Sequence, residues 1–578
     1  MITCGIKLTH DGAIALVEDN RLIFSIEMEK VHNSARYTEI GDTDTIRAIL
    51  EENGYRPRDI DHFVLDGWGG YDPLALAAQP RLVIGEKINK LAVDNAGDPL
   101  LIDIAQYQER DPKNDVLQTW ACSGLEIGKE NFSYSTCLHV AGHVMSAYCT
   151  SPFAARGESA YVLVWDGGMY PRLYFFDAVQ LRVTNLGPLF LLIGNIYTIF
   201  SQHFGPFKVT GSFAKDELSV AGKVMAYVAL GREQKALFPI FTEIYIRCYD
   251  QPMGFANRFA TEFKKAVAGM GYSDEDILLS FHIYLEKLLV EKLIKKIERN
   301  QKKSANICLA GGCALNIKWN SAIRNAGFFK QVYVPPFPND SGSAIGAACT
   351  GIFATNKHYA LDWDVYSGPQ LIQDKPAAGW IEKTCSVRDL ARLIHESGEP
   401  VLVLHGRAEL GPRALGNRSI IGAASSDSMK DILNKVKDRE DYRPVSPICI
   451  VEKAREIFIP GTPDPYMVFD HMVKKEWLRR IPAACHIDGS ARLQTIDHSA
   501  NEVVYDLLTE YEGLSGIPVL CNTSANFKGK GFFPDISSAA EWGRVNYIWS
   551  DDRLFEKVQK VVFHDKAFKV QKNKITVL

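Results

Sequence analysis

Two histidines separated by three residues mark the first stretch of this chain that could do chemistry. His139 and His143 lie in the segment C-L-H-V-A-G-H-V-M-S-A-Y, whose small and apolar residues predict a helix. Residues four apart share one face of a helix, so both imidazoles could reach a single metal ion. Alternatively, one histidine caps the helix and the other is a satisfied core residue, and the pair alone does not decide between these interpretations.

Aspartates follow two of the predicted strands. The apolar run Tyr161–Trp165 is typical of a buried strand, and Asp166 follows it directly, before a turn at Gly167 and Gly168. Asp340 lies at a second strand-to-helix turn. It either caps the following helix or completes, with the histidines and Asp166, a set of ligands for a divalent metal ion.

Glycine-containing turns recur after predicted strands. They occur at Thr9–Gly12 (T-H-D-G), at Asp166–Gly168 and at Ala310–Gly312, and Asn316 follows the last of these. Without a Cβ, the backbone amides of such turns can approach a nucleotide closely. An ordinary hairpin is the alternative at Thr9–Gly12. The repeated strand, turn and helix plan predicts the duplicated α/β architecture shared by actin, hexokinase and Hsp70.

Composition places bounds on the class of protein. A chain of 578 residues is too long for one hydrophobic core and predicts two domains, with three as the alternative. The formal net charge of -4 lacks the basic excess of a nucleic-acid-binding protein, and the most apolar run, Gly187–Phe200, is too short to span a bilayer. Twelve cysteines without a C-x-x-C pair indicate reduced thiols, and the N-terminus lacks an export signal, so we expect a cytoplasmic protein.

Two further segments bear on the fold and the domain boundary and carry no candidate site residue. Residues 70–135 carry patterns that predict several helices. The segment His358–Lys375 contains proline, glycine, glutamine and aspartate that break any periodicity, which predicts a linker between the two domains.

The chain after this linker concentrates cations next to glycines. Three arginines lie in V-L-V-L-H-G-R-A-E-L-G-P-R-A-L-G-N-R-S, further cations follow in K-D-R-E-D-Y-R-P, and a predicted strand ends in N-T-S-A-N. Guanidinium groups beside short polar side chains suit a phosphorylated ligand, whereas a solvated charge run is the alternative. The candidate residues are Arg407, Arg413, Arg418, Lys437, Arg439, Arg443, Ser524 and Asn526.

Taken together, these motifs resemble the O-carbamoyltransferases of the NodU/CmcH type, which include the tobramycin carbamoyltransferase. The matching stretches run in the family's order from residue 9 to residue 526, so the resemblance covers nearly the whole chain. They are T-H-D-G, H-V-A-G-H, W-D-G-G, A-G-G-C-A-L-N, N-D-S-G-S-A-I-G-A-A, G-P-R-A-L-G-N-R-S, K-D-R-E-D-Y-R-P and N-T-S-A-N. Val140 stands where the family often has a second, adjacent histidine, but the spacing from His139 to His143 is kept.

The resemblance implies two domains with separate tasks. Residues 1–360 would form a duplicated actin/hexokinase-like domain, similar to the threonylcarbamoyl transferases that modify tRNA, and residues 361–578 would form a YrdC-like α/β domain. In the family, the C-terminal site makes carbamoyl-adenylate from carbamoyl phosphate and ATP. The N-terminal site then transfers the carbamoyl group to a hydroxyl of a small-molecule acceptor, such as a natural product or a sugar.

The resemblance also implies cofactors and site residues. ATP with Mg²⁺ is expected in the C-terminal site and Fe²⁺ in the N-terminal site, and a homodimer is compatible with the family. His10 and Asp11 match positions near the acceptor, and His10 is our candidate base. The implied metal ligands are His139, His143, Asp166 and Asp340. The implied carbamoyl-phosphate residues are Arg413, Arg418, Lys437, Arg443, Ser524 and Asn526. From the glycine turns themselves, the candidate nucleotide-binding residues are Gly167, Gly168, Gly311, Gly312 and Asn316.

Three other functions stay open at this point. A tRNA threonylcarbamoyl transferase is disfavoured because the chain lacks a basic surface signature and carries its own adenylate-forming domain. A sugar kinase of the actin-hexokinase superfamily has no need of the histidine pair. An inactive nucleotide-binding protein is disfavoured by the intact motifs in both domains.

Overall fold

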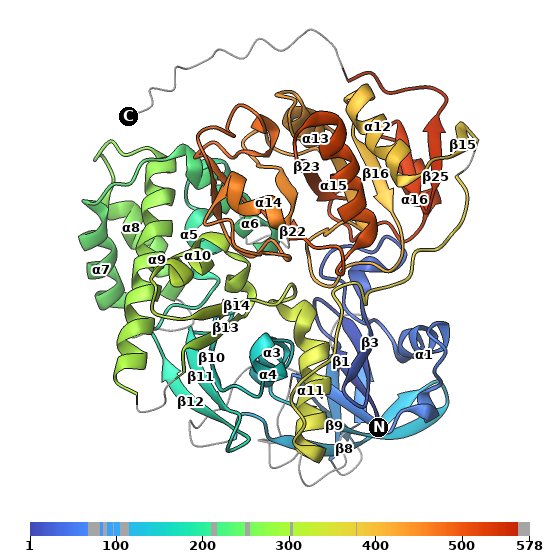
Figure 1. The fold of residues 1–578 in the computed structure, drawn as a ribbon. Helices are drawn as coiled ribbons and strands as arrows, with labels where there is room; N and C mark the ends of the chain where they lie inside the picture. Colours follow the sequence, from blue (N-terminus) through green and yellow to red (C-terminus); the bar gives the residue numbers. More distant parts are fainter. Residues whose placement is uncertain are drawn as a thin grey trace.

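Two sheets with the same strand plan build the first half of the chain (Figure 1). The computed structural model describes residues 1–67, 81–84, 89–95, 98–103, 115–209, 217–248, 255–300, 304–376 and 378–563. The first sheet has the strand order β3-β2-β1-β4-β9-β8. Its strands are β1 (Ile2–Lys7), β2 (Ala13–Glu18), β3 (Arg21–Glu27), β4 (His62–Asp66), β8 (Thr119–Ile127) and β9 (Glu130–Cys137).

The second sheet repeats this plan with the order β12-β11-β10-β13-β14. Each sheet begins with a three-stranded antiparallel meander, and the next strand of the order pairs in parallel with the first strand of that meander. The strands are β10 (Ala160–Val164), β11 (Arg172–Asp177), β12 (Arg182–Pro188), β13 (Asn306–Ala310) and β14 (Gln331–Tyr333). The predicted α/β class is therefore confirmed, and the strand order is duplicated as the sequence predicted.

Two helices of small residues pack against each other and against these sheets. Helix α3 (His139–Cys149) contacts β10 and β13, and α11 (Ser343–Asn356) contacts β1, β2 and β4. A Cβ added to Gly346 would lie 1.9 Å from the carbonyl oxygen of Gly142, and one added to Gly5 would lie 2.0 Å from that of Ala344. Glycine at these positions lets the backbones of α3, α11 and β1 touch.

The prediction of helices over residues 70–135 was wrong for the described part of that range. The described residues there form β8, β9 and a small sheet of β5 (Arg81–Ile84), β6 (Asn89–Asn95) and β7 (Asp98–Asp103). Gly128, with a φ of +67°, turns β8 back onto β9, and β9 continues the sheet by pairing with β4. Pairing with a distant strand thus overrides the local pattern. Residues 68–80, 85–88, 96–97 and 104–114 lie outside the described residues.

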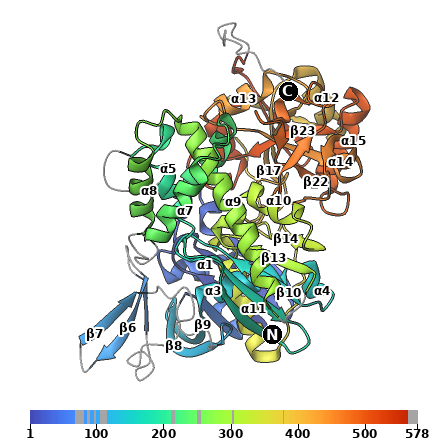
Figure 2. The same ribbon diagram turned by 90° about the vertical axis from the view of Figure 1, so that its left-hand side faces the viewer.

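A helical layer is inserted between β12 and β13 (Figure 2). Its core is rich in phenylalanine, with Phe200, Phe241 and Phe263 in mutual ring contact. Its helices are α5 (Ile196–Ser201), α6 (Glu217–Tyr227), α7 (Leu237–Cys248), α8 (Phe255–Ala266) and α9 (Asp274–Glu298). Three shorter helices of the first half are α1 (Thr43–Glu52), α4 (Pro152–Ala155) and α10 (Ile317–Asn325). None of the described helices has both the length and the apolar character needed to cross a membrane.

The second half is built on an eight-stranded mixed sheet with the order β15-β25-β24-β16-β17-β23-β18-β22. Its strands are β15 (Trp380–Thr384), β16 (Val401–Leu404), β17 (Arg418–Ala423), β18 (Ser446–Ile450), β22 (Gln494–Ile496), β23 (Val519–Ser524), β24 (Tyr547–Ser550) and β25 (Arg553–Lys557). A small sheet contains β19 (Phe458–Ile459), β20 (His471–Val473) and β21 (Ser490–Ala491). The helices are α12 (Val387–Ser397), α13 (Met429–Val436), α14 (Val451–Ile457), α15 (Glu502–Ser515) and α16 (Ile536–Trp542).

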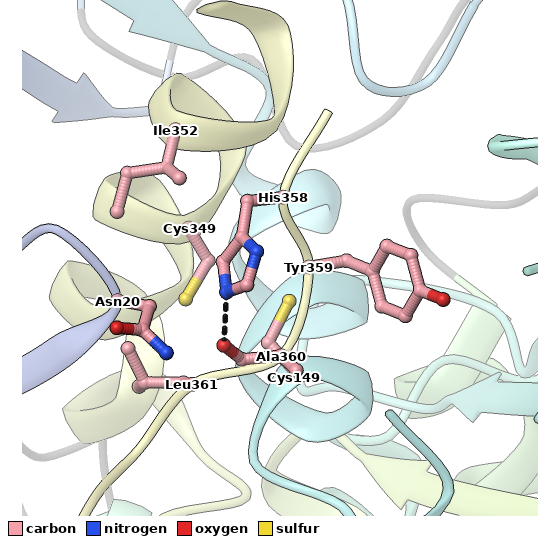
Figure 3. Close-up of a pocket in the computed structure, with 8 residues that line it drawn as sticks. All are labelled: Asn20, Cys149, Cys349, Ile352, His358, Tyr359, Ala360 and Leu361. Atoms are coloured by element: carbon pink, nitrogen blue, oxygen red, sulfur yellow. Dashed lines mark hydrogen bonds between the residues drawn. The ribbon is translucent and has the colours of Figure 1, made fainter. Parts of the chain in front are cut away.

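The predicted linker is an extended strap that is hydrogen-bonded to both halves. On one side, the carbonyl oxygen of Asp362 accepts from the N–H of Leu22 on β3 at 2.8 Å. On the other side, the carbonyl oxygen of Val365 accepts from the N–H of Leu410 in the second half at 2.7 Å. A small pocket lined by Cys149, Cys349 and other residues lies where the strap leaves α11, and no predicted site residue lines it (Figure 3). The boundary predicted at residue 360 falls inside this strap and stays a prediction.

A buried lysine joins the two halves. The ammonium group of Lys30 donates to Glu27 Oε1 at 2.7 Å, to Glu409 O at 2.5 Å and to Gly411 O at 2.8 Å. Glu27 Oε1 also accepts from the N–H of Gly411 at 2.7 Å, and the Lys30 side chain is 1% exposed. Lys30 and Glu27 therefore hold the backbone that leads into the G-P-R-A-L-G-N-R-S motif.

We expect the substitution Lys30→Met to destabilise the chain by roughly 3 kcal/mol, because it leaves the Glu27 carboxylate buried without its cation. Urea unfolding followed by tryptophan fluorescence measures the change. Lys265→Met, in an exposed pair with Glu262, is the matched control and should shift the free energy of unfolding by less than about 1 kcal/mol. Equal shifts for the two variants would contradict the role given to Lys30.

Candidate metal and phosphate sites

The four predicted metal ligands converge in the structure. Ligand atoms of His139, His143, Asp166 and Asp340 all lie within 4.8 Å of one another. The histidines come from the first turns of α3, Asp166 follows β10, and Asp340 lies just before α11. The close crossing of α3 and α11 brings the histidines to Asp340, while the strand end supplies Asp166.

The distances within this cluster suit a single ion. The Nε2 atoms of His139 and His143 lie 3.3 Å and 3.4 Å from the same oxygen, Oδ1 of Asp340. Adjacent ligands about 2.1 Å from one ion are about 3 Å apart, so little movement is needed. The ring nitrogens of His143 make no hydrogen bond within the described residues. Two imidazoles and two carboxylates form a mixed donor set suited to a divalent transition metal, so these residues fit the expected ion.

Asp66 and Lys7 support this cluster from behind. Asp66 Oδ2 lies 2.7 Å from Nδ1 of His139, so the N–H at Nδ1 donates to the carboxylate and Nε2, which faces Asp340, is the ring nitrogen left to bind an ion. The Lys7 ammonium lies 3.3 Å from Asp66 and 3.1 Å from Asp340 Oδ2. Both residues escaped the sequence analysis, although each is a charged residue at the end of an apolar strand, where parallel pairing of β1 and β4 brings the two ends together.

The electrostatics of the cluster favour a cation. Burial lowers the pKa of His139, but the carboxylates of Asp340 and Asp66 outweigh burial and raise it to about 10. Burial raises the pKa of Asp340, yet His139 and Lys7 hold it well below its usual range. The buried carboxylates thus keep their charge and bind a proton on His139, which a metal ion would displace on binding.

His10 and Asp11 lie at the exposed rim of the cluster. Nδ1 of His10 is 3.0 Å from Asp11 Oδ2, and its Nε2 is 3.6 Å from Asp340 Oδ2. The His10 side chain is 45% exposed, whereas that of Asp340 is 4% exposed. Asn339 donates to Asp11 Oδ1 at 3.3 Å. The structure thus places the predicted base where a molecule from solvent can meet the cluster.

The predicted glycine turns lie side by side, because β10 and β13 pair in parallel up to Val164 and Ala310. Gly311 has a φ of +85°, and a Cβ there would lie 2.4 Å from the carbonyl oxygen of Trp165. The N–H of Gly312 donates to Asp166 Oδ1 at 2.5 Å. Close packing against the Asp166 turn therefore requires glycine at position 311, whatever ligand is bound.

The remaining predicted nucleotide-binding residues differ in their surroundings. A Cβ on Gly167 would lie 2.8 Å from Asn195 Oδ1, whereas the space beside Gly168 is open. The Asn316 side chain caps α10 by accepting from the N–H groups of Lys318 and Trp319. A nucleotide-binding role for these glycines and for Asn316 stays a prediction.

A cluster of arginines lies in the second half and includes one residue from the first half. Burial and the neighbouring guanidinium groups lower the pKa of Arg413 to about 10 and that of Arg439 to about 9. Glu440 pairs with Arg443 at 3.7 Å. Mutual repulsion among partly buried cations favours the binding of a polyanion such as a phosphate. The cluster, called here the arginine cluster, consists of Arg36, Arg413, Arg439, Arg443 and Arg492.

Lys437 is fully engaged by the strand end that carries Ser524 and Asn526. Its ammonium group donates to Ser524 O at 2.7 Å, to Asn526 O at 2.8 Å and to Asn526 Oδ1 at 2.6 Å. The Ser524 hydroxyl donates to the same Oδ1 at 2.7 Å. An ammonium group has three N–H donors, so in this structure Lys437 shapes the wall of the site with all of them.

Arg418 is likewise engaged by the backbone. Nη1 donates to His405 O at 2.7 Å and to Asn417 O at 2.9 Å, and Nη2 donates to Gly406 O at 3.0 Å. The residue is 1% exposed. Arg413 and Arg443 of the predicted set lie in the arginine cluster, whereas Arg418 holds the loop that carries Arg413. Binding of carbamoyl phosphate by the predicted residues stays a prediction.

The sequence analysis assigned no role to Arg36 or Arg492. Arg36 lies far along the chain from the other arginines and in the other half, and Arg492 lies in a segment without a matching motif. Neither carries a local pattern that would single it out. Three-dimensional proximity is the signal that identifies them.

Comparison with known proteins assigns the chain to a family. The model of the Carbamoyltransferase N-terminus matches residues 2–349, and that of the Carbamoyltransferase C-terminus matches residues 391–557. Nodulation protein U of Sinorhizobium fredii (strain NBRC 101917 / NGR234) is 46% identical over 573 residues, which cover 96% of this chain and 99% of that protein. The 3'-hydroxymethylcephem-O-carbamoyltransferase of Streptomyces clavuligerus is 30% identical over 564 residues, with 96% and 99% covered.

The comparison with solved structures adds nothing to this assignment. The activator of the 2-hydroxyisocaproyl-CoA dehydratase from Clostridium difficile matches 61% of this chain and 95% of its own, with 12% identity and a TM-score of 0.33. That likeness is too weak to carry an argument. The resemblance inferred from the motifs is nevertheless confirmed by the family models and the curated relatives: the chain is an enzyme of the NodU-type carbamoyltransferase family.

Proposed function

We propose that this chain is an ATP-dependent O-carbamoyltransferase that divides its reaction between two sites. The observation that carries the proposal is the presence of two chemically different clusters in one family member. One offers two imidazoles and two carboxylates to a metal ion, and the other offers several guanidinium groups to phosphates. The duplicated sheets support an actin/hexokinase-like domain over residues 1–360, and we assign residues 361–578 to a YrdC-like domain.

The first step, in this proposal, takes place at the arginine cluster and makes carbamoyl-adenylate. Water cleaves carbamoyl phosphate into carbamate and phosphate. A carbamate oxygen then attacks the α-phosphorus of ATP. The bond from this phosphorus to the bridging oxygen breaks, and pyrophosphate leaves with the electron pair of that bond. Arg413 and Arg443 supply positive charge to the phosphate oxygens, and Mg²⁺ accompanies the nucleotide. The Ser524 hydroxyl oxygen, held by Asn526, orients the carbamoyl group, while Lys437 and Arg418 hold the walls in place.

The second step transfers the carbamoyl group to an acceptor hydroxyl at the N-terminal cluster. The hydroxyl oxygen bonds to the carbamoyl carbon, the bond from that carbon to the phosphate oxygen breaks, and AMP leaves. His10, held by Asp11, takes the hydroxyl proton. His139, His143, Asp166 and Asp340 would hold an ion, which we take to be Fe²⁺, and this ion would supply Lewis acidity to the transfer.

A small molecule with a hydroxyl group is the proposed acceptor. The name of the Streptomyces clavuligerus relative describes O-carbamoylation of a hydroxymethylcephem, and this relative is similar to the chain over nearly its full length. The exposed position of His10 is compatible with an acceptor that arrives from solvent. No structural observation favours the tRNA transferase, the sugar kinase or the inactive protein. Release of ADP instead of AMP would favour the kinase.

We expect the two half-reactions to be separable by mutation. His143→Ala should abolish transfer to the acceptor but keep release of pyrophosphate from ATP and carbamoyl phosphate, because it removes only a metal ligand. Arg443→Ala should reduce pyrophosphate release by roughly tenfold or more, because it removes a cation that contacts phosphate. A pyrophosphate assay and mass spectrometry of the acceptor measure the two steps. Loss of both activities in His143→Ala would overturn the division between sites.

Metal binding itself can be tested without activity. The purified wild type should retain about one transition-metal ion per chain by elemental analysis, and His143→Ala should retain far less. His395→Ala, which removes a histidine from the last turn of α12, is the control and should bind metal like the wild type. Equal metal content in wild type and His143→Ala would count against the site.

Asp66→Asn should weaken metal binding by roughly 10–100-fold, because a neutral amide accepts a weaker hydrogen bond from Nδ1 of His139 and no longer makes the imidazole a stronger ligand. Titration of Fe²⁺ or Mn²⁺ into the metal-free chain, followed by calorimetry, gives the affinity. The pyrophosphate half-reaction should be unchanged, which separates this effect from unfolding. Wild-type affinity in Asp66→Asn would show that Asp66 does not position the ligand.

A further inference from the structure

Residues 31–40 of the first half include a stretch that packs against a loop of the second half. The N–H of Arg36 donates to Gly529 O at 3.0 Å, and the N–H of Gly531 donates to Ser34 O at 3.1 Å. Ala35 forms an isolated antiparallel bridge with Lys530. This stretch, called here the connecting segment, therefore lies against the loop that directly follows Ser524 and Asn526.

Close packing fixes this contact. A Cβ added to Gly531 would lie 1.7 Å from the carbonyl oxygen of Glu29, so the two backbones touch there. The side chain of Asn33 donates to Ser538 Oγ at 2.7 Å. Asn33 has a φ of 54°, a left-handed conformation that asparagine tolerates better than most residues other than glycine. The position of Arg36 is therefore set by contacts on both sides of it.

The other end of the connecting segment lies on the turn that carries the proposed base. The N–H of Asp11 donates to Tyr37 O at 3.3 Å, and the N–H of Gly12 donates to Thr38 O at 2.9 Å. Burial raises the pKa of Tyr37, the charge of Arg36 opposes that shift and the charge of Asp11 adds to it, so the phenol senses both charges. In the connecting segment, Arg36 thus contacts the loop after Asn526, and its neighbour Tyr37 contacts the turn that carries His10.

Arg36 has no carboxylate partner among the described residues, yet it lies among cations. Besides burial, its charge contributes to lowering the pKa of Arg413, Arg439 and Arg443. A guanidinium group held next to other guanidinium groups costs free energy unless an anion binds between them. A phosphate with several oxygens can accept from more than one guanidinium at once.

We propose that Arg36 is a phosphate-binding residue of the C-terminal site, contributed by the N-terminal half, so that this site is complete only when the halves are docked. The proposal rests on the proposed function in one respect, namely that the phosphates belong to ATP and to its product pyrophosphate. The halves of the enzyme are then chemically as well as sterically dependent on each other.

The test uses the full chain and measures binding of pyrophosphate and of ATP by calorimetry. Arg36→Met should weaken pyrophosphate binding by roughly tenfold or more, because one charged hydrogen-bond donor is lost. Arg36→Lys should fall between the wild type and Arg36→Met, since it keeps the charge without the planar fork. Arg58→Met, in an exposed pair with Glu130 of the same half, is the control and should bind like the wild type.

A second variant separates binding from structure. Asn33→Ala removes the bond to Ser538 and loosens the connecting segment but keeps Arg36. If Asn33→Ala weakens pyrophosphate binding as much as Arg36→Met does, or if Arg36→Met binds like the wild type, the proposal for Arg36 is overturned. A wild type that binds ATP and pyrophosphate but never makes AMP would instead overturn the proposed function and leave the role of Arg36 intact.

Discussion

The backbone contact between α3 and α11 is the constraint on which the rest of the N-terminal site depends. Gly142 and Gly346 allow the two helices to touch, and Gly5 allows β1 to lie against α11. A side chain at any of these positions would push a helix away by more than the tolerance of a metal site. The histidines of α3 and the aspartate before α11 meet because the two helices touch at glycines, which have no side chain to separate the backbones.

This packing also explains why charged residues can remain buried in the cluster. Lys7 and Asp66 end neighbouring parallel strands beneath α11, so their charges balance those of the ligands at distances of about 3 Å. A buried carboxylate without such partners would become protonated and would lose its affinity for a cation. Lys7 and Asp66 therefore stabilise the buried charges of the cluster, as water does at an exposed site.

Sequence reasoning located the residues whose roles follow local rules. The spacing of His139 and His143 on one helix face, and the positions of Asp166 and Asp340 after strands, were enough to group them. Lys7 and Asp66 escaped notice because only the pairing of distant strands unites them. The fold class and the duplicated sheets were predictable from the repeated turns, whereas the hairpin of β8 and β9 depends on a partner strand far away in the chain.

The sequence is less informative about what a cation does than about where it lies. Arg413 and Lys437 look alike as members of cationic motifs, but Lys437 spends its donors on the strand end and Arg413 does not. Arg418 likewise binds backbone carbonyls. A motif shows that a cation is present at a position. Whether that cation binds a ligand or the protein's own carbonyl groups follows only from the acceptors around it in the structure.

The strap between the halves has a mechanical consequence. Backbone hydrogen bonds join the strap to β3 on one side and to residues near Leu410 on the other. The strap therefore fastens the two halves to each other and is not a flexible hinge. A swing of one half against the other would rupture one of these rows, at a cost of about 1 kcal/mol for each bond. In the proposed two-site reaction, the intermediate would therefore pass between two halves that the strap holds together on both of its sides.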